Sequence, residues 1–577
     1  MSNAVRFGRL LALVAVAGVN VWILWTFHDQ HWYPADEGNY AHVAERILQG
    51  DVLHRDIQDL HAGLINFVNA GAFAAFGLDL VSLRYPLVLI GVVQALLVWR
   101  LFAARSIILA AAAATAATSV GIIQFLNPTA HWYALFCTVS LMVWLTEVPR
   151  ESRVRIVGAG VLIGVITLFR QLTGVWIGMA VLVVTFSERR EYAHGSELLL
   201  SRAILISLTF VLSWYLVVTD GADPGGIVLF ASAPAALLIL ALRSVRLTNR
   251  TTALISLQLG VGMLVACAPL LAYHVSHGSV AHWISDVVGA SLALTQLPFF
   301  EQAWFGILPL LAFVEVTTSF DFVRIVNGLY WIAVALAAAM NGVLAVRAFS
   351  RGERDKLIVP IVASFYALVT LHLNGTIYLY YSVGLSLVAL LWWTSHASIS
   401  VRLAATTVAL GICAVALQFH AAQSSLRRPI DALRGRRTVT AATATCAPLP
   451  RSHLRIEKAE CEDYYRLVNA IQLAVPAGST IFALPSDAEL YFLADRRNPF
   501  GFYNTALGIR TATDVTEVLR VLREKPPSLI TFRPDDKYNT PLSLRIMDDV
   551  RRSYERVDTI GGIELYRPRP DLRRNMS

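Results

Sequence analysis

Apolar runs of about 16–24 residues recur along the first 420 residues of the chain, separated by short polar breaks. A helix rises about 1.5 Å per residue, so such a run crosses the roughly 30 Å hydrocarbon core of a bilayer. No run shows a polar face, and one soluble globule could not enclose a dozen helices that are apolar all round. Because unpaired backbone groups in lipid cost several kcal/mol each, the spans must be helical. We therefore expect a polytopic α-helical membrane protein.

A charged domain is predicted to follow the spans. Of the 48 lysine and arginine residues, 23 lie up to His420 and 25 lie in the last 157 residues. We expect a membrane domain at 1–420 and a small α/β domain at 421–577, here called the tail domain, because helical and strand patterns alternate there. About thirteen spans are predicted, starting near Leu10, Leu80, Ile107, His131, Val154, Leu172, Leu199, Gly226, Leu254, Val323, Leu357, Ile377 and Ile399.

The distribution of basic residues among the loops predicts which side of the membrane domain faces the cytoplasm. If the N-terminus is cytoplasmic, 18 of the 23 lie on the inner side, as the positive-inside rule requires. The odd number of spans then places the tail domain outside the cytoplasm. Much of the positive charge behind the net charge of +8 lies in membrane loops, where orientation explains it, so we predict no nucleic-acid partner. The five outer arginines are Arg46, Arg55, Arg84, Arg170 and Arg324.

Two outer segments are long, 28–79 (the first outer loop) and 274–322 (the second outer loop), and long structured loops are usually functional. In the first, apolar residues from Tyr40 to Leu48 have helical spacing, which predicts an amphipathic helix lying on the membrane surface. Asp36 stands at its expected N-cap. Helix capping is the plainer interpretation of Asp36 and Glu37. Ionisable groups at a membrane interface, however, mark function more often than elsewhere.

The acidic pair after the first span, followed by Gly50-x-x-x-His54-Arg55-Asp56-x-x-Asp59, resembles the first outer loop of the GT-C membrane glycosyltransferases. The resemblance is closer to the bacterial branch related to protein O-mannosyltransferases and aminoarabinose transferases. It extends to the thirteen spans, the outer tail domain and the segment from Leu484 to Pro499. Where relatives often carry an aromatic or Pro-rich stretch after the second Asp, this chain has Leu60-His61-Ala62-Gly63.

The resemblance implies an inverting glycosyltransferase that uses a sugar linked to a polyprenyl phosphate. A carboxylate can serve as the base for an attacking hydroxyl, and the phosphate leaving group needs positive charge rather than an acid. Asp36 is the expected base, with Glu37 as its orienting partner. The scarcity of outward arginine makes Arg55, Arg84 and Arg170 candidates for binding the phosphate. Candidates for the sugar or acceptor site are Asp56, Asp59, His61 and Tyr381. A solvated loop or a salt bridge to Arg55 would account for the first three equally well, and a plain aromatic belt would account for Tyr381.

The remaining polar patterns predict no cofactor. His274 and His277 have a spacing that could ligate a divalent metal, but interfacial histidine is the commoner case. In the tail domain, Cys446 and Cys461 can form a disulfide if the compartment is oxidising. Closing a loop of about 15 residues would contribute roughly 3 kcal/mol.

The sequence thus predicts a multi-pass enzyme of the bacterial cytoplasmic membrane, acting on its outer face among membrane lipids. It would move a sugar from a polyprenyl-phosphate donor to an envelope glycan, lipid or protein. A transporter or flippase is one alternative, but it would show inverted repeats or charges within the spans. A glycan polymerase or ligase is another, and would feature clustered outer arginines.

Overall fold

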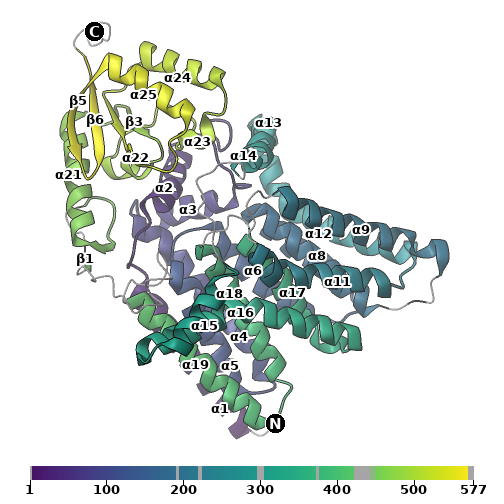
Figure 1. Ribbon diagram of the computed structural model, residues 1–577. Coiled ribbons are helices and arrows are strands. Elements are labelled where there is room, and N and C mark those ends of the chain that lie inside the picture. The colour runs from purple at the N-terminus through teal and green to yellow at the C-terminus, as the bar shows by residue number, and fades with distance from the viewer. Residues whose placement is uncertain are drawn as a thin grey trace.

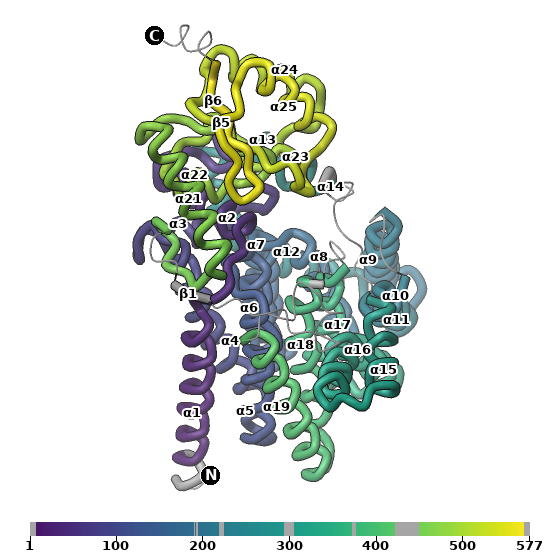
Figure 2. The backbone as a smooth tube through the Cα atoms, turned by 60° about the vertical axis from the view of Figure 1, so that its left-hand side comes forward, coloured from purple at the N-terminus to yellow at the C-terminus, as the bar shows by residue number. Residues whose placement is uncertain are grey.

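The computed structural model describes residues 3–189, 191, 194–218, 224–294, 305–371, 376–421, 443–445 and 449–569. It is a bundle of long helices that carries a small α/β domain at one end (Figure 1). The N-terminus lies at the opposite end of the bundle from the tail domain (Figure 2). This arrangement fits an odd number of spans.

Ten helical segments among the described residues are long and apolar enough to cross a membrane. The other three predicted spans coincide with helices α6, α7 and α17, whose residues are largely buried. The helices of the bundle are α1 (Asn3–Phe27), α4 (Tyr85–Ala103), α5 (Ile107–Ala116), α6 (Ala130–Glu147), α7 (Arg153–Phe169), α8 (Gln171–Glu188), α9 (Leu199–Val218), α11 (Ser232–Ser244), α12 (Asn249–Ser276), α16 (Phe322–Arg351), α17 (Ile358–Tyr366), α18 (Thr376–Thr394) and α19 (Ile399–Ala421).

Several bundle helices are extended by tighter or wider turns. Helix α5 continues through η2 (Ala117–Gly121) and η3 (Ile122–Phe125), so that the continuous segment is long enough to span. The other such turns are η1 (Leu80–Arg84), η4 (Gly195–Leu198), η5 (Ile227–Ala231) after α10 (Pro224–Gly226), η7 (Arg354–Lys356) and η8 (Ala367–Leu371).

The second outer loop is more structured than the sequence predicts. It contains α13 (Val280–Ile284), η6 (Ser285–Ala290) and α14 (Ser291–Leu294), and then α15 (Leu308–Thr318), which packs along α16 within the bundle (Figure 2). The two helices approach closely at Gly328, where an added Cβ would lie 2.9 Å from the carbonyl oxygen of Ala312. Part of this segment is therefore a short bundle helix and not a loop above the bilayer.

The tail domain is built on a four-stranded sheet in the order β3-β4-β6-β5. Strands β3 (Ile481–Leu484) and β4 (Leu529–Phe532) are parallel, with Ile481 opposite Leu529, whereas β6 (Ile563–Pro568) pairs antiparallel with both β4 and β5 (Tyr554–Ile560). A two-stranded ribbon, β1 (Thr443–Thr445) with β2 (Arg455–Glu457), lies outside this sheet. The helices are α21 (Lys458–Ala474), α22 (Glu489–Ala494), α23 (Thr505–Gly508), α24 (Ala512–Glu524) and α25 (Pro541–Ser553).

The alternation of side chains along β3 gives the sheet two buried faces. Phe482 and Leu484 pack with residues of α24 and α25. Ile481 and Ala483 belong instead to a core that includes α21 and α22 and extends into the first outer loop. That loop folds as α2 (Pro34–Leu48) and α3 (Leu64–Phe76), so it shares a hydrophobic core with the tail domain.

Helix α2 differs from its prediction in two respects. It begins at Pro34 after Tyr33, so Asp36 lies in its first turn and is not the N-cap residue. Its buried Ala41 and Ala44 pack in the core shared with the tail domain, which means that this face does not lie on the membrane surface. Close packing is possible at Gly38, where an added Cβ would lie 2.5 Å from the main-chain nitrogen of Glu489 at the start of α22.

Candidate active site

Asp36 lies where the tail domain meets the membrane bundle, in the first turn of α2 and beside Asn127, and this junction is called the recess below. The Asn127 Nδ2 atom donates a hydrogen bond to Asp36 Oδ2 at 3.3 Å. The side chain keeps accessible surface although protein atoms surround it, as expected of a group that lines an internal recess. Burial raises the pKa of Asp36, and the charges of Lys537 and His61 oppose that rise. The site therefore presents a reachable carboxyl with unusually high basicity.

Glu37 is buried behind Asp36 and pairs with Arg84. Arg84 Nε donates to Glu37 Oε1 at 2.7 Å, and the Tyr33 main-chain N–H donates to Glu37 Oε2 at 2.9 Å. The other guanidinium N–H groups donate to the carbonyl oxygens of His28, Gln30 and His31. With all three guanidinium nitrogens engaged and no exposed surface, Arg84 does not fit the predicted role of phosphate ligand. This pair joins α2 to the residues that follow α1. Glu37 therefore acts by holding the first turn of α2 in place.

Arg170 lies in the recess, at the break between α7 and α8. Its backbone is extended, with φ −146° and ψ 104°, which ends one helix and starts the next. Its side chain makes a hydrogen bond with Tyr378. The charges of Asp36 and Arg170 both act on Tyr40, Tyr378 and Tyr381, so the two groups are within electrostatic reach of the same hydroxyls. Of the three predicted phosphate ligands, Arg170 has the position that fits.

Aromatic rings of α2, α6 and α18 line this part of the recess. Tyr381 stacks on His131 with ring centroids 3.8 Å apart and lies 5.5 Å from the ring of Tyr378. Tyr40 donates a hydrogen bond from its hydroxyl to Thr129 Oγ1 at 3.3 Å. Burial raises the pKa of Tyr40, so it remains a neutral hydroxyl at physiological pH. The cluster offers ring faces and hydroxyl groups, the two kinds of surface that a sugar contacts.

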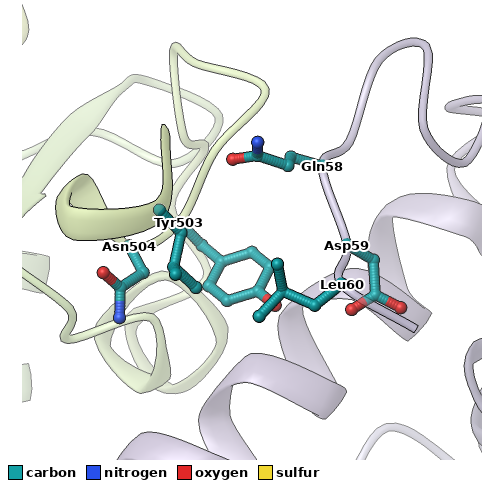
Figure 3. A pocket seen from close by; sticks show the side chains of 6 residues that line it. Gln58, Asp59, Leu60, Tyr503 and Asn504 are labelled. Carbon is teal, nitrogen blue, oxygen red and sulfur yellow. The ribbon is translucent and has the colours of Figure 1, made fainter. Parts of the chain in front are cut away.

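Asp59 and His61 form a second polar group at the edge of the recess. His61 Nδ1 lies 3.0 Å from Asp59 Oδ1, and Asn66 Nδ2 donates to Asp59 Oδ2 at 2.5 Å. Burial alone would raise the pKa of Asp59, but the neighbouring His61 and the hydrogen bonds outweigh it and lower the pKa. Asp59 also lines a small pocket shared with Tyr503 and Asn504 of the tail domain, with room for little more than a water molecule (Figure 3).

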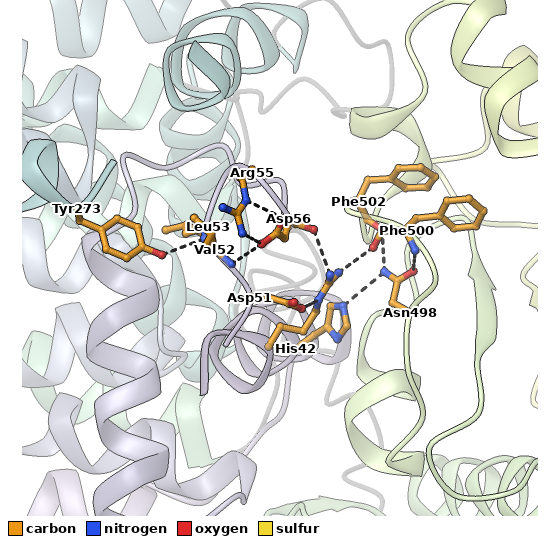
Figure 4. A network of polar contacts seen from close by, with 11 residues as sticks. His42, Asp51, Val52, Leu53, Arg55, Asp56, Tyr273, Asn498, Phe500 and Phe502 are labelled. Atoms are coloured by element: carbon orange, nitrogen blue, oxygen red, sulfur yellow. Dashed lines mark hydrogen bonds and ion pairs between the residues drawn. The ribbon is translucent and has the colours of Figure 1, made fainter. Parts of the chain in front are cut away.

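Arg55 and Asp56 lie away from the Asp36 recess. The Arg55 guanidinium donates to both carboxylate oxygens of Asp56, at 3.0 and 2.8 Å, and is largely exposed. The hydrogen bond from Arg55 is the main cause that lowers the pKa of Asp56. The Asp56 and Phe500 carbonyl oxygens accept bonds from Arg46, which links this turn to the tail domain (Figure 4). This geometry supports a docking role and does not bring either residue to the predicted phosphate or sugar site.

The tail domain contributes Lys537 and Tyr538, which no sequence pattern identified as site residues. They lie in the segment between β4 and α25, and both interact electrostatically with Asp36. Burial raises the pKa of Tyr538, and the Asp36 charge adds to that effect. The only signal in the sequence is a polar segment, Asp535-Asp536-Lys537-Tyr538, shortly after the apolar residues that form β4. Nothing in that segment indicates which distant loop it meets.

The remaining predictions concern histidine and cysteine. His274 Nδ1 lies 2.8 Å from Ser279 Oγ, and its ring stacks on Trp283 at 4.6 Å. Within the described ranges, no group of three or more His, Cys, Asp or Glu residues could hold a metal ion. Cys461 is disulfide-bonded, whereas Cys446 lies outside the described residues, so the Cys446–Cys461 pairing stays a prediction.

Comparison with known proteins gives structural likeness alone. No family model and no curated protein matches the chain. Among solved structures, similarity is found to ArnT from Cupriavidus metallidurans, in one structure bound to undecaprenyl phosphate and in another in the apo state. Each comparison covers 98% of this chain and 99% of that chain, with 13% sequence identity and a TM-score of 0.39. No assignment of activity follows from a likeness of this degree.

Proposed function

We propose that the protein is a membrane glycosyltransferase that moves a sugar from a polyprenyl-phosphate donor to an acceptor hydroxyl. The observation that carries the proposal is the pairing of one accessible carboxyl, Asp36, with one cation, Arg170, around a shared cluster of tyrosines. A base and a phosphate-binding cation are the two groups that such a transfer needs. The acceptor belongs to the cell envelope, as a glycan, a lipid or a protein.

In the proposed reaction, the Asp36 carboxylate takes the proton of the acceptor hydroxyl as its oxygen attacks the anomeric carbon. A raised pKa makes Asp36 a stronger base, provided that it is ionised at the working pH. The bond between the anomeric carbon and the phosphate oxygen breaks, and the polyprenyl phosphate leaves as an anion. Attack on the face opposite the leaving group inverts the anomeric centre. No acid is required, because the departing phosphate is already a stable anion.

Arg170 stabilises the leaving group in this scheme. A guanidinium can hold two phosphate oxygens at once, and its charge counts for more in a recess from which protein excludes water. Tyr378 holds the Arg170 side chain, while the ring face of Tyr381 and the Asp59–His61 pair are candidates for contacting the sugar. Glu37 and Arg84 hold the first turn of α2, and thereby Asp36, in place.

The proposed setting is the outer face of the bacterial cytoplasmic membrane, with the N-terminus in the cytoplasm. The bias of basic residues toward one side of the bundle supports this orientation. Asp36, Arg170 and the tail domain then all lie at the outer end, where a lipid-linked donor can enter from the bilayer among other membrane lipids.

The test is an Asp36→Asn variant in proteoliposomes, with undecaprenyl-phosphate-linked hexoses and pentoses as donors and envelope extract as acceptor. Loss of the base should lower sugar transfer, measured by mass spectrometry, by about 100-fold or more. Insertion and binding of undecaprenyl phosphate should persist. The matched control is Asp548→Asn, on an exposed face of α25.

Transfer by Asp36→Asn at the wild-type rate would remove Asp36 from the reaction. Movement of the lipid-linked sugar across the bilayer without any product, in the wild-type protein, would instead favour the flippase alternative.

A further inference from the structure

Gln171 follows Arg170 as the first residue of α8, and its side chain connects this helix to both outer loops. Its Nε2 atom donates to the carbonyl oxygen of Leu60 in the first outer loop, at 2.8 Å, and to that of Val287 in the second, at 3.4 Å. A glutamine amide carries two N–H groups, so one can serve each carbonyl. The side chain thus holds two segments that are 111 and 116 residues away in the chain.

The carbonyl group of Leu60 is held from two sides. Ser291, also in the second outer loop, donates a hydrogen bond from Oγ to this oxygen at 3.1 Å, in addition to the bond from Gln171. A carbonyl oxygen has two lone pairs, so both are then used. Leu60 stands between Asp59 and His61, whose side chains pair at 3.0 Å. Fixing the Leu60 peptide therefore fixes the directions in which these two side chains leave the main chain.

An apolar cluster packs the same three segments together. It contains Leu168 near the end of α7, Ala62 of the first outer loop and Val287 of the second. Trp283 of α13 packs against this cluster, and its Nε1 atom donates to the carbonyl oxygen of Ala62 at 2.9 Å. The cluster brings the segments into contact, but apolar attraction has no preferred direction, whereas a hydrogen bond does. The bonds of Gln171 are therefore suited to setting how the segments are aligned.

The corner between α7 and α8, which carries Arg170 and Gln171, has little freedom of its own. Gly174 of α8 packs against Thr167 of α7, where an added Cβ would lie 2.8 Å from the Thr167 Cα atom. The main-chain N–H of Arg170 donates to the carbonyl oxygen of Ile166 at 2.7 Å, and the N–H of Gly174 donates to that of Arg170 at 3.0 Å. Both side chains therefore leave from one rigid corner.

We infer that Gln171 is a positioning residue of the active site, which sets the distance between Arg170 and the Asp59–His61 pair. The inference rests on the proposed function and deepens it, because it assigns a residue that acts through its neighbours. In the proposed reaction Arg170 holds the phosphate and the pair contacts the sugar. These two parts of the donor are joined through one oxygen atom at the anomeric carbon, so the groups that bind them must be held at a matching distance.

Hydrogen–deuterium exchange of the full-length protein in nanodiscs tests the connection without any substrate. Gln171→Met keeps the length of the side chain and removes both N–H donors, and Gln171→Glu keeps the shape but its ionised carboxylate cannot donate. Both should speed exchange in 57–63 and 285–291 by about 10-fold, because losing these hydrogen bonds makes local opening easier. Gln418→Met, at an exposed glutamine of α19, should exchange as the wild type does.

Two further measurements separate positioning from general damage to the fold. With a lipid-linked sugar that the wild type transfers, Gln171→Met should lower transfer by about 10-fold. Its binding of bare undecaprenyl phosphate, which has no sugar to align, should stay within about twofold of the wild type, whereas Arg170→Met should lose that binding. In the Arg170→Met background, Gln171→Met should lower transfer little further, because both residues serve one alignment.

Unchanged exchange at both loops in Gln171→Met and Gln171→Glu would overturn the inference, and so would an equal fall in transfer and in undecaprenyl phosphate binding. It would also fail if the losses of transfer in Gln171→Met and Arg170→Met were additive. Faster exchange at both loops in a protein whose wild type transfers no sugar would keep Gln171 as the residue that aligns the loops with α8 and would reject the proposed function.

Discussion

At the scale of single residues, arginines that look alike in the sequence have different surroundings. Arg84 is fully buried and bonded through all three guanidinium nitrogens, Arg55 is exposed beside its chain neighbour Asp56, and Arg170 is hydrogen-bonded to Tyr378 of the tyrosine cluster. All three were predicted to bind phosphate, because outward arginine is scarce. The partner that distinguishes Arg84 is Glu37, 47 residues away in the chain. Such pairings depend on tertiary contacts, which a local pattern does not contain.

The difference between these arginines can be measured as stability. Arg84→Met leaves the buried Glu37 carboxyl without its partner, which typically costs about 3–5 kcal/mol. We expect a large fall in the thermal unfolding midpoint of the purified protein. Arg55→Met removes an exposed ion pair, and pairs of that kind contribute little to stability. Equal, small effects of the two substitutions would contradict the structural role of Arg84.

At the scale of elements, helix α2 shows what a periodic pattern of apolar residues can and cannot predict. The spacing of apolar residues predicted the helix, and the structure has it at Pro34–Leu48. The pattern could not identify the surface that covers its apolar face, because a membrane and a protein domain bury such a face equally well. Helix α15 was not predicted as part of the bundle. Its 11 residues are too few for a span, so its apolar run was assigned to a loop.

Close packing between α2 and α22 leads to a prediction about glycine. Alanine is usually more favourable than glycine inside a helix, by about 1 kcal/mol. At Gly71 of α3 an added Cβ meets nothing within 4 Å, so Gly71→Ala should leave stability unchanged or raise it. At Gly38 the Cβ would lie 2.5 Å from Glu489 main-chain nitrogen, so α22 must move away.

Gly38→Ala should therefore destabilise the protein by about 1–3 kcal/mol, as overpacking generally does. It should also speed proteolytic release of the tail domain from membranes, as followed by gel electrophoresis. Parallel behaviour of Gly38→Ala and Gly71→Ala would show that the two domains are not packed through this contact.

At the scale of the whole molecule, the helical body and the tail domain were predictable because both follow from composition and periodicity. Each predicted span start falls at or near a helix of the bundle. This holds also for α6, α7 and α17, which are not among the ten segments that are long and apolar enough to cross a membrane. The sequence placed Asp36 in an outer loop but could not show that a loop more than 490 residues later would meet it. The recess is a product of domain docking, and docking depends on contacts between residues remote in the chain.

That docking should depend on pH through Glu489. Burial, followed by the charge of Asp487, raises the pKa of Glu489 to about 8, well above the usual value near 4.5. A carboxyl whose pKa is higher in the folded state contributes stability that is fully present below pH 4.5. That contribution declines as the pH rises and is lost once the pH passes about 8. Because Glu489 packs on Gly38, ionisation places an additional buried charge at the contact between the tail domain and α2.

We therefore expect the thermal unfolding midpoint of the protein in nanodiscs to fall between pH 5 and 9, and Glu489→Gln to flatten that fall, because a neutral amide cannot ionise. Glu517→Gln, at an exposed glutamate paired with Arg520, should retain the wild-type slope. If Glu489→Gln kept the full pH dependence, other groups would have to account for it. If it flattened the curve and also gave more sugar transfer than the wild type above pH 8, the protonated Glu489 side chain would be what keeps the tail domain docked on α2.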